Sequence, residues 1–195
     1  MPEVSTFSRD QALSIVNEFI KSPNLVNHML AVEAAMRFYA HLYGEDEEVW
    51  GQAGLLHDFD WEKYPSLEQH GVAGAPILRQ RGVPEVIVQA ILSHVEYSGV
   101  KRETKLQKTL FACDELTGLI TAVALVRPSR SLMDLTSKSV KKKWKDKAFA
   151  AGANREEIEI AASELGIDLW QHVDNVILAM RGISDTLGLS GDSVN

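Results

Sequence analysis

The chain alternates between stretches with helical hydrophobic spacing and short polar or glycine-containing breaks. In residues 8–22, apolar Leu13, Val16 and Ile20 recur three and four residues apart, as on one helix face, and Ser8 is placed to cap that helix. Similar patterns predict further helices within 24–44, 46–58, 67–82, 83–99, 102–128, 138–147, 154–166 and 168–188. No segment alternates with the period of a strand over a convincing length. The pattern therefore predicts an all-α fold, a compact multi-helix bundle.

Two local signals refine this prediction. Pro76 falls inside the segment 67–82, where a proline would split or kink a helix. Asn154 is followed three residues later by Glu157, which is the spacing of a capping box at the start of a helix. At the other end of the chain, residues 189–195 are expected to fray.

The length of 195 residues, with 45% hydrophobic and 24% charged residues, is typical of one soluble globular domain. We expect a single domain over 1–195, in which 8–23 add an N-terminal helix and 130–190 a C-terminal helical elaboration. The absence of a long apolar run argues against a membrane span, and the first residues lack the pattern of a secretory signal. One cysteine, Cys113, excludes an internal disulfide and suits a reducing cytoplasm. The predicted location is cytoplasmic.

Charge is unevenly distributed along the chain. The formal net charge of −7 argues against nucleic acid as a partner. The segment 138–147 nevertheless carries six lysines and one acid. Such a patch is a candidate anion site, although a solvated helix face is the alternative for each lysine taken singly.

Several predicted elements place an ionisable residue on the face that bears the apolar residues. These residues are His28, His57, His70, His94 and Asp114. One inward histidine is usually a hydrogen-bonded core residue, but so many imidazoles and carboxylates buried together require a compensating cation. Ligation by histidine and aspartate without sulfur suits Mn, Fe, Co, Ni or Zn.

The order of these residues resembles that of the HD superfamily of metal-dependent phosphohydrolases, named for a His-Asp doublet. Here the doublet lies in "WGQAGLLHDFDWE", preceded by "NHMLAVEAAMRFYA" and followed by "AILSHVEYSG" and "ACDELTGLITAVALVRP". The resemblance implies that one metal ion is held by His28, His57, Asp58 and Asp114. In two-metal members the doublet aspartate bridges, and His70 and His94 occupy the positions of ligands to a second ion.

One departure from the family pattern concerns the residue two after Asp58. Many members read His-Asp-Ile-Gly, whereas this chain reads "HDFD" and so adds Asp60. We expect Asp58 to orient water or accept its proton, and Asp60 to act beside it by orienting a histidine ligand or water. A helix cap or a loop contact is the alternative role for Asp60.

The resemblance further implies an enzyme that hydrolyses a phosphomonoester or phosphodiester, of a nucleotide or another small phosphorylated metabolite, through a metal-activated water. The expected cofactor is one or two divalent ions, among Mn, Fe, Co, Ni, Zn and Mg. The cations expected to fold over the substrate are Arg127, Lys138, Lys141 and Lys142. A di-iron oxygenase and a non-catalytic HD signalling module are the alternatives, and a homo-oligomer remains open.

Overall fold

The computed structural model describes residues 7–191, and within them it contains helices but no strand. The elements are α1 (Arg9–Phe19), α2 (Pro23–Tyr43), α3 (Glu47–Leu56), α4 (Ala75–Gln80), α5 (Glu85–His94), the 3₁₀ turn η1 (Glu96–Ser98), α6 (Lys105–Leu125), α7 (Ser137–Trp144), α8 (Arg155–Leu165) and α9 (Leu169–Arg181). The predicted all-α fold is confirmed. None of the described helices is both long enough and apolar enough to cross a membrane.

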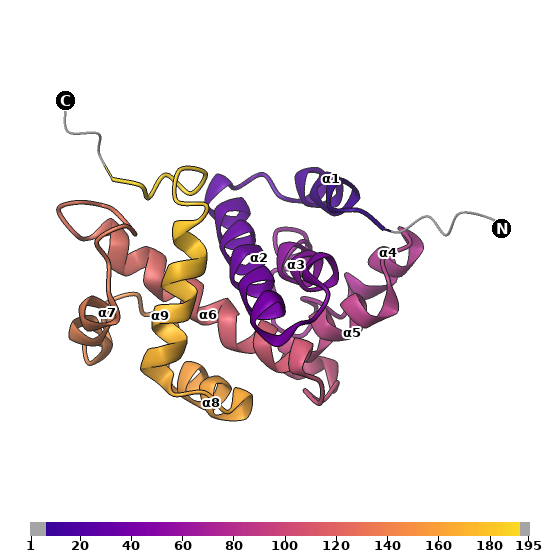
Figure 1. Cartoon of the computed structure of the whole chain (residues 1–195). Coiled ribbons are helices and arrows are strands. Elements are labelled where there is room, and N and C mark those ends of the chain that lie inside the picture. The colour runs from indigo at the N-terminus through magenta and orange to yellow at the C-terminus, as the bar shows by residue number, and fades with distance from the viewer. Residues whose placement is uncertain (1–6, 192–195) are drawn as a thin grey trace.

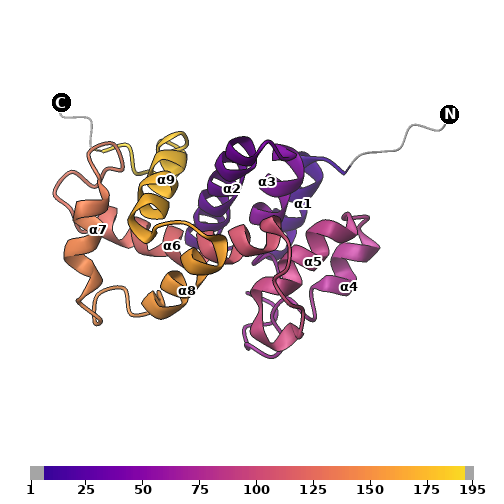
Figure 2. The same cartoon turned by 60° about the horizontal axis from the view of Figure 1, so that its bottom comes forward.

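The long helix α6 connects the two ends of the molecule. It packs against α2, α3 and α5 and also against α7, α8 and α9. Figures 1 and 2 show α4 and α5 at one end and α7 at the opposite end. Helix α2 lies between α3 and α9, and α1 covers α3. The apolar faces of these helices meet in one continuous core.

Most helix boundaries follow from the capping residues in the sequence. Ser8 caps α1 in a capping box with Gln11. The Asp46 side chain caps α3 by accepting hydrogen bonds from two backbone amides. Gly44 ends α2 with φ of 68°, a left-handed conformation that glycine adopts without steric cost.

Three local predictions are corrected. The segment 67–82 is helical only in α4, because Gly71 has φ of 71° and Pro76 belongs to the first turn of the helix. Helix α5 ends at His94 and is followed by η1. The tail expected at 189–195 lies outside the described residues from 192 onward. Before that point Leu189 is buried and Ser190 forms a bridge with Ser131.

A buried hydrogen-bonded histidine joins α9 to α2 and α6. His172 accepts a hydrogen bond from the Tyr39 hydroxyl at Nδ1 (2.5 Å) and donates from Nε2 to the Ala112 carbonyl (2.8 Å). Its ring is fully buried, and burial lowers its pKa from 6.5 to about 4, against the opposing effect of the Ala112 carbonyl. The protein therefore holds His172 neutral across the ordinary pH range.

This burial predicts a pH-dependent loss of stability. Unfolded His172 binds a proton near pH 6.5 and folded His172 only near pH 4, so acidification favours the unfolded chain. The contribution of neutral His172 to the free energy of unfolding is fully present above pH 6.5 and is lost as the pH falls to about 4. At about 1.4 kcal/mol per pKa unit, the loss is about 3 kcal/mol in total. Denaturant unfolding of the wild type and of His172→Gln at several pH values measures it. A difference between the two proteins that does not change with pH would contradict the assignment.

Candidate metal centre

Helices α2, α3, α5 and α6 bring the predicted ligands to one place. His28 lies in the second turn of α2, and His57 and Asp58 follow the last residue of α3. His94 ends α5, and Asp114 lies midway along α6. The sixth residue, His70, is buried in the turns that precede α4. Residues separated by as many as 86 positions thus share a common centre.

A glycine permits the close approach of α3 to α2. A Cβ atom at Gly54 would lie 2.9 Å from the backbone nitrogen of Glu33 and from the carbonyl oxygen of Val32. No side chain fits in that space, so only glycine lets these two helices pack at this distance. Since Gly54 is one turn before His57, this contact sets how far the His57 ring reaches toward α2.

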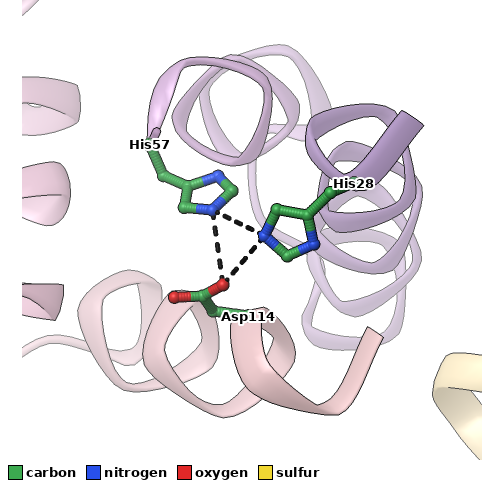
Figure 3. Close-up of side chains that lie close together, drawn as sticks. All are labelled: His28, His57 and Asp114. Atoms are coloured by element: carbon green, nitrogen blue, oxygen red, sulfur yellow. Dashed lines mark hydrogen bonds and ion pairs between the residues drawn. The ribbon is translucent and has the colours of Figure 1, made fainter. Parts of the chain in front are cut away.

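The first triad consists of His28, His57 and Asp114 and is shown in Figure 3. The Nε2 atoms of the two histidines are 3.2 Å apart. Oδ1 of Asp114 lies 3.0 Å from Nε2 of His28 and 3.4 Å from Nε2 of His57. The three ligand atoms therefore surround a single point, as the ligands of one ion do.

The second triad consists of Asp58, His70 and His94. Oδ1 of Asp58 lies 3.1 Å from Nε2 of His70 and 3.6 Å from Nε2 of His94, and these two nitrogens are 3.3 Å apart. The other oxygen of Asp58, Oδ2, faces the first triad, at 3.5 Å from Nε2 of His57. Asp58 thus offers one oxygen to each triad, as the family resemblance implies for a bridging carboxylate.

All four histidines use Nδ1 as a donor to the protein, which fixes their rings. The acceptors are the Gly54 carbonyl for His57 (2.7 Å), the Ile91 carbonyl for His94 (2.5 Å), Oδ1 of Asp60 for His70 (2.8 Å) and the Thr117 hydroxyl for His28 (3.3 Å). The Thr117 hydroxyl gives its own hydrogen to the Asp114 carbonyl and is free to accept. Each ring, when neutral, therefore turns an unprotonated Nε2 toward the centre of its triad.

These lone pairs and carboxylates repel one another unless positive charge lies between them. Burial alone would lower the pKa of His57 and His70, but Asp58, Asp114 and Asp60 outweigh it. They raise the pKa of His57 well above its usual value and that of His70 to about 9. A divalent ion bound at about 2.0–2.2 Å from such ligands would supply the positive charge that protons on these histidines otherwise provide. The donor set of each triad fits such an ion.

The centre is closed on one side and open on the other. The side chains of His57, His70 and His94 are 0%, 6% and 4% exposed, whereas those of His28 and Asp114 are each 21% exposed. A cavity of about 890 Å³ opens at this exposed side, and Asp58 and both triads contribute to its lining. The ions and a small molecule could therefore meet in one space.

Asp60 does not reach this cavity, contrary to its expected place among the catalytic carboxylates. Its side chain is fully buried. Oδ1 accepts from His70, and Oδ2 accepts from the backbone amide of Gly71 at 3.0 Å. Its contact with His70 agrees with the expected role of orienting a histidine ligand, and its contact with the Gly71 amide agrees with the alternative of a loop contact.

The predicted substrate-binding cations also lie elsewhere, and this prediction is wrong. Arg127 follows Asp114 by 13 positions, which is about 20 Å along the α6 direction, and it pairs with Asp134. Lys138, Lys141 and Lys142 belong to α7, at the far end of the molecule from α5, and none of them lines the cavity. Their closeness to Asp114 in sequence did not indicate closeness in space.

The cavity contains other residues that the sequence reading missed. Arg102 is the only arginine or lysine among the lining residues within 7–191, and it lies 3.7 Å from the Phe111 ring centroid while pairing with Glu164. Glu115 also lines the cavity, and its burial and Asp114 raise its pKa to about 7. The only sequence signal for Glu115 was its place beside Asp114 on the longest helix.

Comparison with known proteins agrees with this geometry. The HD domain family model matches residues 25–119, a segment that contains both triads. Residues 25–119 form an HD domain. HD domains belong to a superfamily of metal-dependent hydrolases that bind divalent ions. The resemblance noted in the sequence is thereby confirmed.

One relative is an uncharacterized protein, MJ0778, of Methanocaldococcus jannaschii. It is 34% identical over 103 residues, which are 50% of this chain and 59% of the archaeal protein. The similarity therefore spans little more than half the length of that relative. No solved structure matches the chain.

Two triads that share Asp58 predict about two divalent ions per chain, because each triad offers one complete set of ligand atoms. His94→Gln should reduce the content to about one ion, and Asp58→Asn should weaken both sites because it removes the shared charge. His41→Gln is the matched control, since His41 is 82% exposed and belongs to neither triad. Elemental analysis of protein purified without chelator gives the counts. Equal metal content in all four proteins would contradict the two-site geometry.

Proposed function

We propose that the protein is a metal-dependent phosphohydrolase that cleaves the ester of a small phosphorylated molecule, with its ions held by the two triads. The observation that carries this proposal is the carboxylate of Asp58, which belongs to the second triad, faces the first triad and lines a cavity of about 890 Å³. Such a paired centre suits in-line displacement at phosphorus, in which the attacking and leaving oxygens both need stabilisation.

The reaction is the transfer of a phosphoryl group to water. The bond from phosphorus to the ester oxygen breaks, a bond from phosphorus to the water oxygen forms, and a proton from water passes to the leaving oxygen. Divalent ions, when bound, neutralise charge on the phosphoryl oxygens and lower the pKa of water.

The residues of the chain position the reactants. The side chains of His28, Asp58 and Asp114 are the triad members most exposed to the cavity, at 17–21%. They therefore define the point at which phosphate and water arrive. Trp61 packs edge-on against the His70 ring, at 4.9 Å between centroids, and shields the second triad from bulk water.

Hydrolysis of 4-nitrophenyl phosphate, nucleotides and sugar phosphates with Mn, Co, Ni, Zn, Mg or Fe(II) tests the proposal. We expect ion-dependent phosphate release, a loss of about 100-fold or more in Asp58→Asn and of about 10- to 100-fold in Asp60→Asn, which disturbs only the orientation of His70. His41→Gln should match the wild type, and circular dichroism should show that each variant is folded.

The contrary outcomes separate the alternatives. Two irons per chain with a mixed-valence signal, and no phosphate release from any ester, would replace hydrolysis by oxidative chemistry. Absence of bound metal together with absence of turnover would leave a non-catalytic HD module.

A further inference from the structure

One wall of the cavity is built by α6, by the loop before α8 and by the first turn of α8. It is lined by Glu115, Gly118, Ala150, Gly152, Ala153 and Glu157, which we call the α6–α8 arm. Glu115 directly follows Asp114, so the arm begins beside the first triad. A phosphate ester bound at the triads would extend its leaving group into the arm or toward solvent.

Gly118 leaves the arm open at a place where the fold does not require a glycine. It lies in the interior of α6, where a glycine makes the helix less stable than an alanine would, by about 1 kcal/mol. A Cβ atom there would meet nothing within 4 Å, and the backbone is not left-handed. Packing within the protein therefore does not require this glycine, and the space beside it is open.

The outer side of the arm is held rigidly in place. The Arg155 guanidinium donates to the carbonyls of Phe149, Ala150 and Ala153 at 2.5–2.7 Å, which fixes the loop before α8. This wall therefore exists before any ligand binds.

Asn154 holds the two carboxylates of the arm. Its backbone amide donates to Glu115 at 3.2 Å, and its side-chain amide donates to Glu157 at 2.7 Å. In the capping box expected from the sequence, Glu157 would accept from the backbone amide of Asn154. Glu115 of α6 takes that place instead, so both acids face the arm.

Neither acid has a cationic partner among residues 7–191. No lysine, arginine or histidine nitrogen there lies within 4.0 Å of Glu115 or Glu157. By contrast, the buried Glu33 pairs with two arginines. Arg102, which also lines the cavity, is already bound to Glu164 and Phe111. The arm thus places two carboxyl groups that have no cationic side-chain partner beside the proposed phosphate site.

We propose that the substrate is a phosphate ester whose leaving group carries a positively charged amine, which Glu115 and Glu157 bind in the α6–α8 arm over Gly118. This inference rests on the proposed function and narrows its substrate class. A cation between two half-buried carboxylates is stabilised, whereas the additional phosphates of a nucleoside polyphosphate would be repelled there.

Phosphoethanolamine and propyl phosphate form a matched pair of ligands, because they differ mainly in an ammonium group replaced by a methyl group. Calorimetry with the Mn-loaded full chain should show about tenfold or more tighter binding of phosphoethanolamine, and ADP should bind more weakly than either. Glu115→Gln and Glu157→Gln should each reduce the ratio of the two affinities, and the double variant should bring it close to one. Glu156→Gln is the matched control, because it removes a charge from the adjacent exposed residue outside the cavity and should preserve the ratio.

Gly118 provides an independent test of the same arm. Gly118→Ala should raise the melting temperature, because helix propensity improves and the new methyl group meets no protein atom. Gly118→Leu should weaken phosphoethanolamine binding by about tenfold or more, because its side chain fills the arm.

Equal affinities for the two phosphates, a preference for ADP, or no binding of any of them would overturn the inference. A third metal ion that is lost in Glu115→Gln would also overturn it. Turnover separates this inference from the proposed function. Preferential binding of phosphoethanolamine without hydrolysis would support amine binding in the arm and contradict the proposed phosphohydrolase activity. Hydrolysis without a preference for the amine would support the phosphohydrolase activity and contradict amine binding in the arm.

Discussion

The structure depends on the electrostatic balance around Asp58. Four imidazoles donate through Nδ1 to fixed protein acceptors, so their Nε2 atoms converge on two carboxylates. Such a set is unfavourable without positive charge, and its neighbours are arranged to keep it in place. Gly54 brings α3 against α2, and Asp60 is buried to hold His70. These packing contacts hold the histidine Nε2 atoms around the oxygens of Asp58 and Asp114.

The matched HD segment and the rest of the chain contribute different parts of the site. All six candidate ligands fall within 25–119. The outer wall of the cavity, from Ala150 to Glu157, comes from beyond that segment. Helix α6 joins the two parts, since Asp114 belongs to the first triad and Glu115 and Gly118 belong to the α6–α8 arm. In this account one part of the chain provides the proposed chemistry and the other selects the leaving group.

The sequence predicts what depends on local rules. Periodicity and caps located most helices, and the apolar faces indicated that one set of ionisable residues would be buried together. That set was His28, His57, His70, His94 and Asp114. It fails where distant segments decide the outcome. The lysines of α7 follow Asp114 closely in sequence, but the length of a straight α6 carries them away from it. The capping box at Asn154 has the right spacing, yet Glu115 from another helix takes the amide. No local pattern reports such a competition.

X-ray diffraction from Mn-loaded crystals at the manganese absorption edge tests the central claim most directly. The account predicts two anomalous peaks on opposite sides of the Asp58 carboxylate, one contacting His28, His57 and Asp114 and the other contacting His70 and His94. A centre with these side chains in place and no peak at either position would contradict it.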